Sequence, residues 1–227
     1  MFNLFKKKQT PADAKNAIRD TLLGDVPIPE WGKDVTDGVP WSLFAEAREH
    51  IVKRQNYPDA IKIYKQITEM PGLESRHYLQ AWHFLHRLKV AVPPEIDPKV
   101  YGVLVDVRLE NGTEFVAAYK DHSARYFNYT GGGIVWEAPD SSLNEMIDKL
   151  LQACEVVTRQ LPPLTLEQGR PIPPKNVGAV QINILTPGGI RHGIGTFETL
   201  AKIETAAPIV GMATELMRSL IDKNSRK

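Results

Sequence analysis

Cysteine is almost absent from this chain, since Cys154 is the only one among 227 residues. A single thiol cannot form an internal disulfide, so the hydrophobic core must hold the fold, and a reducing, cytoplasmic compartment is expected. A surplus of one charge is also missing, because 28 Lys and Arg residues oppose 27 Asp and Glu residues, a formal net charge of +1. Strong nucleic-acid binding needs a concentrated basic excess and is therefore not expected.

Long apolar runs are missing as well, and no stretch approaches the roughly 18 consecutive apolar residues that indicate a membrane-spanning helix. The N-terminal segment Met1–Lys8 combines Phe2, Leu4 and Phe5 with three lysines, a set that could contact an anionic bilayer. One short apolar cluster anchors weakly, which favours a solvated terminus over membrane-surface contact.

The composition is that of an ordinary globular protein, with 42% hydrophobic and 24% charged residues. The length allows one large domain or two small ones, and changes of pattern divide the chain into three parts. Proline and glycine interrupt residues 1–40, which predicts an extended, loosely structured N-terminal segment. Residues 41–92 show helical spacing, and residues 99–227 show the alternation of strands together with two long helical stripes.

Apolar residues in the middle part recur at three- and four-residue spacing, as they do on the buried side of a helix. This spacing predicts two helices over about residues 41–72, separated by a turn at Gln55–Pro58. It predicts a third helix over Ser75–Lys89, before the proline-rich linker Val92–Lys99. We expect the three helices to lean on the domain that follows them.

The first two of these helices carry bulky and small residues in a characteristic order. Phe44 and Ala47 belong to the first helix, Ala60 and Tyr64 belong to the second, and Pro71 follows. In this order the pair resembles a single tetratricopeptide unit. The resemblance implies a helical hairpin that needs stacked neighbours to bury its apolar face, although the chain contains no second full copy.

At the start of the third part, apolar residues recur every second residue instead of about every 3.6 residues, which indicates strands. The first strand is predicted over Tyr101–Leu109, the turn at Asn111–Gly112 closes a hairpin, and Thr113–Lys120 returns. A third strand is predicted over Ala124–Trp136, with an interruption at Thr130–Gly133. This meander of three strands is the first half of the predicted sheet domain.

The second half of the domain alternates helices with a further pair of strands. A continuous apolar stripe from Leu143 to Leu161 predicts a long helix buried on the sheet. Ala179–Leu185 and Ile190–Phe197 are predicted strands, and Pro208 opens a last helix. The order β-β-β-α-β-β-α predicts an α+β fold with an antiparallel sheet and with its helices on one face.

Two polar turns are the candidate sites of this domain, and Asp121–Arg125 is the first. Asp121, His122 and Ser123 suggest a nucleophile with its base, but consecutive residues of a tight turn generally point apart. A polar hairpin turn whose side chains bond local backbone is the alternative interpretation. His122 and Arg125 are retained as candidate ligand-binding residues, and no catalytic residue is predicted.

The second candidate turn is the glycine-containing stretch Thr186–Gly195. Gly188 and Gly189 allow backbone amides to approach an anion, while Arg191 and His192 could add side-chain contacts. The stretch connects two strands, whereas a phosphate loop of the usual kind leads from a strand into a helix. Close packing within a turn is therefore the competing interpretation of these glycines.

Metal and cofactor chemistry are not predicted from the remaining reactive side chains. His83 and His86 are three residues apart and could share a helix face, but a metal site needs further ligands from elsewhere. Cys154 lies on the apolar stripe of the long helix, where a thiol behaves as a small hydrophobic group.

These observations support two functional hypotheses from different classes. The first is a non-enzymatic, cytoplasmic interaction or accessory protein of bacterial type, whose helical segment would face a protein partner. The alternative is a small-molecule or anion-binding enzyme that uses the 121–125 and 186–195 loops. The alternative requires both loops to lie at one edge of the sheet with their side chains in one cleft. The oligomeric state is left open by the sequence.

Overall fold

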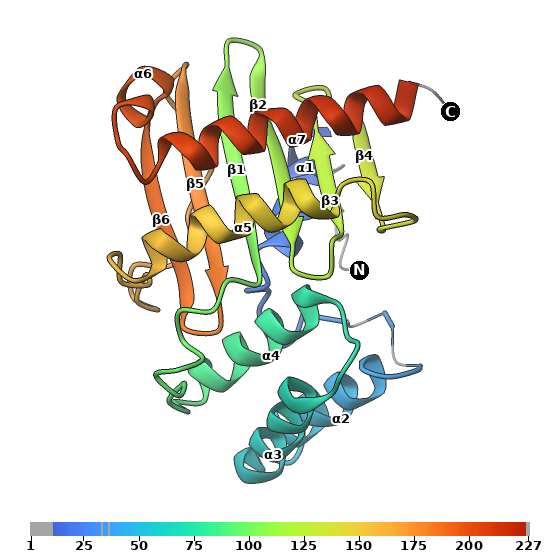
Figure 1. The fold of residues 1–227 in the computed structure, drawn as a ribbon. Coiled ribbons are helices and arrows are strands. Elements are labelled where there is room, and N and C mark those ends of the chain that lie inside the picture. The colour runs from blue at the N-terminus through green and yellow to red at the C-terminus, as the bar shows by residue number, and fades with distance from the viewer. Residues whose placement is uncertain (1–10, 33, 36, 226–227) are drawn as a thin grey trace, which may run out of the picture.

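The computed structural model describes residues 11–225 except residues 33 and 36, and it has an α+β fold built around one sheet (Figure 1). The sheet has six strands in the order β4-β3-β2-β1-β5-β6, and every neighbouring pair is antiparallel. The strands are β1 (Gly102–Leu109), β2 (Gly112–Tyr119), β3 (Ala124–Phe127), β4 (Gly133–Trp136), β5 (Ala179–Thr186) and β6 (Gly189–Thr196). The long strands β1, β2 and β5 form the centre, and the shorter β4 and the longer β6 form the two edges.

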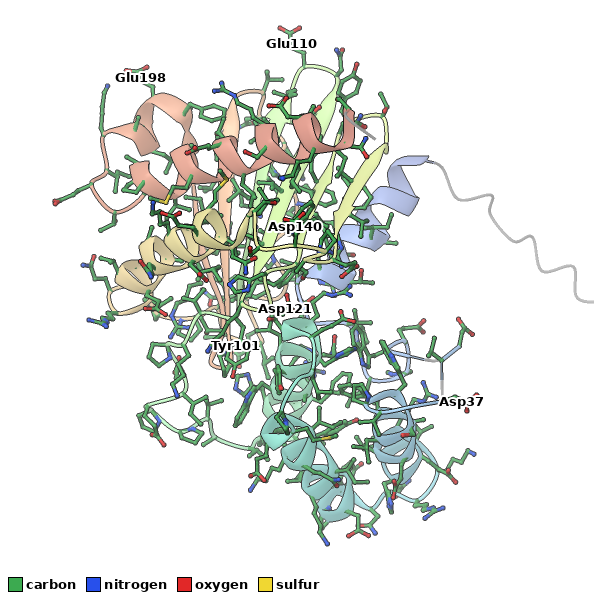
Figure 2. All side chains as sticks on the ribbon, turned by 45° about the vertical axis from the view of Figure 1, so that its right-hand side comes forward. Asp37, Tyr101, Glu110, Asp121, Asp140 and Glu198 are labelled. Atoms are coloured by element: carbon green, nitrogen blue, oxygen red, sulfur yellow. The ribbon has the colours of Figure 1, made fainter. Side chains whose placement is uncertain are left out.

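The meander contains four strands, so the prediction of a single third strand over 124–136 was wrong. Asn128 reverses the chain between β3 and β4, because its side-chain oxygen accepts hydrogen bonds from the backbone N–H groups of Thr130 and Gly132. Gly131 has φ +92°, a value that glycine adopts without strain. The predicted β1–β2 hairpin is confirmed, with Leu109 opposite Gly112 and Glu110 at its tip (Figure 2).

One face of the sheet is covered by two long helices, α5 (Asn144–Thr158) and α7 (Ala207–Ser225), as Figure 1 shows. A short helix, α6 (Phe197–Ala201), connects β6 to α7. The apolar stripe of α5 packs into the main core with Val103 and Val105 of β1 and with Leu216 of α7. Cys154 is fully buried in this core, and burial raises the pKa of its thiol. The thiol is thus a packing group, as its position in the stripe predicted.

The opposite face is covered in part by the helix α1 (Pro11–Leu22) of the N-terminal segment, whereas the two long helices predicted for the sheet domain share one face as expected. Leu22 and Leu23 join Leu104, Phe115 and other residues of the sheet in a second apolar cluster. The Tyr119 hydroxyl donates a hydrogen bond of 2.6 Å to the carbonyl of Leu22. The N-terminal segment is therefore an integral layer of the sheet domain.

The remaining helices, α2 (Trp41–Val52), α3 (Tyr57–Glu69) and α4 (Ser75–Arg87), pack together at one end of the sheet (Figure 1). Phe44, Tyr64 and Phe84 contribute one ring from each helix to the shared core. We call these three helices the helical unit. The predicted hairpin of α2 and α3 is confirmed, whereas membership of the tetratricopeptide family stays a prediction.

None of the described helices combines the length and the hydropathy that a membrane crossing needs. The segment Met1–Lys8, for which membrane-surface contact was considered, lies outside the described residues.

Candidate functional site

A cavity of about 860 Å³ lies where the helical unit meets the sheet domain. We call it the junction cavity. Its walls come from α4, from residues 23–29, from the β5–β6 turn and from residues 163–170, which belong to a proline-rich loop between α5 and β5. Segments far apart in the sequence thus enclose one space, and the predicted glycines Gly188 and Gly189 belong to its lining.

The inner wall of the junction cavity is mainly apolar. This part of the lining consists of Leu23, Pro27, Ile28, Leu79, Val90, Pro163, Leu164, Leu185 and Ile190. Gln80, which is fully buried on α4, holds the 23–29 segment against the helix. Its side-chain amide accepts a hydrogen bond from the Val26 N–H at 3.0 Å and donates one to the Val26 carbonyl at 2.8 Å.

The polar groups of the junction cavity are mostly basic. His83 and His86 line it from α4, and burial lowers the pKa of both imidazoles, that of His83 to about 4. Both rings are therefore neutral at pH 7 and can donate or accept a hydrogen bond. Arg170 reaches the cavity from the proline-rich loop and forms ion pairs with Asp20 and Asp25.

A buried polar network lies beside the junction cavity on the α1 face of the sheet. The Arg19 guanidinium makes two hydrogen bonds of 2.7 Å to Asp106, and these side chains are 1% and 0% exposed. Asp106 also accepts a hydrogen bond from the Asn183 amide at 3.1 Å. Because that amide donates to Asp106, the Asn183 oxygen faces His192 and accepts the hydrogen of its Nδ1 at 3.2 Å.

This network places His192 at a second, smaller cavity of about 370 Å³. Burial lowers the pKa of His192, so its ring is neutral. Because Nδ1 carries the ring hydrogen, the Nε2 of His192 is the hydrogen-bond acceptor. Ile194 and the strap formed by residues 168–175 complete this cavity, which we call the β6 cavity. The sequence pattern predicted His192 as a candidate but missed Arg19, Asp106 and Asn183, since an isolated Asp or Asn in a strand carries no recognisable motif.

The first predicted loop connects the sheet to the helical unit, as Figure 2 shows for Asp121. The Asp121 carboxylate accepts hydrogen bonds from the Ser75 N–H at 2.6 Å and from both the N–H and the hydroxyl of Ser123. The Asp121 N–H in turn donates to the Ser75 hydroxyl at 3.1 Å. These contacts fix the start of α4 against the β2–β3 turn.

His122 and Arg125 are also engaged in local contacts. His122 lies 2.9 Å from the Asp148 carboxylate on α5. Arg125 donates to the carbonyls of Ala124 and Trp136 and pairs with Glu137. The polar groups of this loop therefore stabilise the turn and the β3–β4 edge.

Arg191 of the second predicted loop is buried between structural partners. It donates to the Leu161 carbonyl at 3.0 Å and contacts Thr186 and Asp97. A side chain at Gly188 would collide with the same aspartate, since a Cβ there would lie 2.0 Å from Asp97 Oδ1. Close packing of the turn is thus one reason for this glycine.

The structure does not bring the four candidate side chains into one cleft. The β2–β3 and β5–β6 turns lie at the same end of the sheet, but β2, β1 and β5 separate Arg125 from Arg191. At about 4.8 Å between neighbouring strands, the two arginines are about 19 Å apart across the sheet. Their strand positions also direct them to opposite faces, with Arg125 and His192 on the α1 face and Arg191 on the α5 face.

Within the described part of the chain, no group of three or more His, Cys, Asp or Glu side chains is placed to hold a metal ion. Comparison of the chain with family models, curated proteins and solved structures found no match.

The contacts of Asp121 lead to the first testable prediction. We expect Asp121→Ala to lower the free energy of unfolding by roughly 2–3 kcal/mol at pH 7, because several charge-assisted hydrogen bonds are lost. Burial alone would raise the pKa of this carboxyl, but the hydrogen bonds from Ser123 and Ser75 outweigh burial and hold it below 3.8. A lowered pKa stabilises the folded state above the unfolded value and loses that effect as the pH falls through the folded value.

Urea denaturation between pH 3 and pH 7 measures both parts of this prediction. The difference between the native protein and Asp121→Ala should be full above about pH 5 and should shrink towards pH 3. Asp222→Ala removes an exposed carboxylate from α7 and should change the unfolding free energy by less than about 0.5 kcal/mol. A difference for Asp121→Ala that is independent of pH would contradict the assigned role of the carboxylate.

Proposed function

We propose that this protein is a non-enzymatic accessory protein that binds a small organic anion in the junction cavity. The observation that carries the proposal is the cavity itself, at about 860 Å³ and with walls from both the helical unit and the sheet domain. This volume lies in the range of small-molecule sites, which favour the interfaces between structural units.

The apolar inner wall indicates a ligand with an apolar body. Ile28, Val90 and Ile190 are partly exposed and offer surface from three different segments to one bound molecule. The neutral His83 and His86 imidazoles add a few hydrogen-bonding groups to this wall. An apolar lining with a small number of polar groups is the usual composition of a ligand pocket.

The charges of the lining indicate the anionic group of the ligand. Arg87 and Lys89 contribute two cations, whereas Asp25, the one carboxylate of the described lining, is paired with Arg170. Arg87 and Lys89 are exposed, so they lie at the rim, where they would attract an anion without being desolvated in its absence. A carboxylate or sulfonate on an apolar body matches this distribution.

The engagement of the polar loop residues supports a non-enzymatic role. Asp121, Arg125 and Arg191 form hydrogen bonds with backbone and side-chain partners within the fold. The alternative, an enzyme that uses the 121–125 and 186–195 loops, needs these groups in one cleft and finds no support in their arrangement on two faces.

A protein partner and a cytoplasmic location are further parts of this proposal. The hairpin of α2 and α3 exposes Val52 and Tyr57 beside its turn, and exposed apolar side chains of this kind suit a partner surface. The lone buried thiol of Cys154 suits a reducing compartment. The bacterial type expected for the chain is likewise a proposal. Co-purification of a stoichiometric protein complex under native conditions would test the partner.

The ligand proposal is tested with anilinonaphthalene sulfonate, a fluorescent probe that has an apolar body and one anionic group. We expect saturable binding that is at least about tenfold tighter than that of the neutral N-phenylnaphthylamine. Ala91→Trp places an indole at the exposed rim of the cavity and should weaken binding of the sulfonate by about tenfold or more.

Ala201→Trp provides the matched control, since Ala201 is exposed on α6 and does not line the junction cavity. This variant should bind the sulfonate as tightly as the native protein does. Equal affinity of Ala91→Trp and Ala201→Trp, or no preference for the sulfonate over the neutral probe, would overturn the proposal.

A further inference from the structure

The edge strand β6 differs from the other sheet edge in its length and exposure. β6 extends over Gly189–Thr196 and pairs only with β5, whereas the opposite edge, β4, has four residues. Natural proteins protect long edges with lysine, proline or a covering segment. The β6 sequence contains neither lysine nor proline, so neither of these two residue types protects the edge. A Cβ at Gly193 would meet nothing within 4 Å, so the face of the strand opposite to His192 is open at this position.

The hydrogen-bonding groups of β6 alternate between β5 and the outside. The hairpin register pairs Thr186 with Gly189, so Ile190, His192 and Ile194 direct their backbone groups away from β5. The Leu164 N–H already donates to the outward carbonyl of Ile190 at 2.7 Å. The chain itself thus begins a strand-like pairing that stops before His192, and no backbone partner outside β5 is found for His192 or Ile194 among residues 11–225 as described.

The β6 cavity lies directly beside these outward groups. The side chains of His192 and Ile194 point to the α1 face and line the cavity together with Ile172 of the strap. Ile194 is 56% exposed and Ile172 is 63% exposed, so an apolar surface accompanies the open backbone. Alternate side chains of an added strand would fall on the same face and enter this cavity.

The charge of the β6 cavity identifies the kind of partner. Lys175 lines it, and no carboxylate belongs to its described lining. Arg170, the other cation of the lining, is already paired with Asp20 and Asp25. An acidic side chain between apolar ones complements this lining. A second copy of the chain is disfavoured, since antiparallel pairing of two β6 strands would bring two basic cavities towards each other.

We infer that β6 and the β6 cavity bind an extended peptide segment of a partner protein, which adds to the sheet as a seventh strand and carries apolar and acidic side chains at every second position, so that both kinds face the cavity. Main-chain hydrogen bonds to His192 and Ile194 would supply affinity, as in other cases of strand addition. The apolar and acidic side chains would supply specificity through Ile172, Ile194 and Lys175. This inference stands apart from the junction cavity, because Ile194 does not line that cavity.

The probe is a fluorescein-labelled peptide of the sequence Ser-Val-Thr-Glu-Thr-Val-Ser with blocked ends, in which both valines and the glutamate fall on one face of an extended strand. Its binding is followed by fluorescence anisotropy. We expect saturable binding that weakens at high salt, and at least about tenfold weaker binding when lysine replaces the glutamate. Absence of binding at millimolar peptide, or equal binding of both peptides, would overturn the inference.

Ile194→Pro is the decisive variant. It removes an outward N–H but no hydrogen bond of the β5–β6 ladder, and edge strands tolerate proline at such positions. Binding should fall by about tenfold or more. Val135→Pro on the exposed β4 edge is the matched control and should leave peptide binding unchanged. Binding of anilinonaphthalene sulfonate should survive in Ile194→Pro, which separates this test from that of the junction cavity.

A second measurement keeps the test valid if Ile194→Pro fails to fold. Amide hydrogen exchange of the native protein should slow at His192 and Ile194 when the peptide is added, because their N–H groups become hydrogen-bonded. Binding without such protection would overturn the inference. A stable dimer whose interface protects the same amides would also overturn it, because a second copy would then be the occupant of β6.

Discussion

Replacement of Arg19 by methionine is expected to lower the free energy of unfolding by about 3–5 kcal/mol, the usual effect of removing one partner of a buried ion pair. The guanidinium makes two hydrogen bonds to Asp106 and donates to the Pro171 carbonyl at 2.9 Å. Without it, a fully buried carboxylate keeps only the amide groups of Asn183 and Gln181. The loss is a large fraction of the roughly 5–15 kcal/mol by which native proteins are stable.

The pH dependence of the stability of Arg19→Met distinguishes the effect of an unpaired Asp106 carboxylate from that of a packing defect. Burial raises the pKa of Asp106 above 3.8, and the Arg19 side chain partly offsets this effect. In the variant the pKa rises further, and an acid whose folded pKa is raised gains stability as the pH falls towards the unfolded value. The deficit of Arg19→Met should therefore be largest near pH 7 and should shrink towards pH 4.

Two controls complete this experiment, which uses urea denaturation. The double variant Arg19→Met with Asp106→Leu removes both charges and should recover most of the lost stability. Arg159→Met replaces an exposed arginine after α5 and should change the unfolding free energy by less than about 0.5 kcal/mol. If the double variant were less stable than Arg19→Met alone, the loss would lie in packing and not in the uncompensated charge.

Gln80→Leu is expected to lower the free energy of unfolding by roughly 2–4 kcal/mol, because the N–H and C=O groups of Val26 would lose their partners in a buried setting. Leucine nearly preserves the volume of glutamine, so lost hydrogen bonds dominate the effect. The 23–29 segment forms one wall of the junction cavity. Its release should therefore also weaken binding of anilinonaphthalene sulfonate.

Urea denaturation and probe binding on the same samples measure both effects. Gln66→Leu is the matched control, since Gln66 is exposed on α3 and the same atoms are exchanged. Its stability should stay within about 0.5 kcal/mol of the native protein. Loss of stability in Gln80→Leu with unchanged probe affinity would show that the 23–29 segment is not needed as a wall of the cavity.

The two proposed binding regions are connected by one loop. Leu164, Gly169 and Arg170 line both the junction cavity and the β6 cavity. The loop is held at Pro171 by Arg19 and at Arg170 by Asp20 and Asp25, all from the N-terminal part of the chain. Arg19 and Asp20 of α1, together with Asp25, therefore position a loop that forms part of the wall of both cavities.

Local sequence patterns determined the elements of this protein. The spacing of apolar residues indicates whether a segment forms a strand or a helix. Alternation indicated a strand at Tyr101–Leu109, and helical spacing indicated helices from Phe44 onwards and in the stripe that contains Cys154. These patterns were sufficient to predict the α+β class, the first hairpin and the buried thiol. They failed at Asn128, where one side chain reverses the chain by bonding backbone groups that alternation does not reveal.

Tertiary structure alone decided which polar groups meet. Arg19 and Asp106 are 87 positions apart, and nothing in either neighbourhood signals that a helix and a central strand will bring them into contact. The same applies to the junction cavity, whose walls come from four separate segments. Periodicity reports whether a residue faces a core, whereas the identity of its neighbour depends on strand order and layer packing. The β2–β3 and β5–β6 turns therefore share one end of the sheet, as the sequence allowed, while Arg125 and Arg191 point to opposite faces.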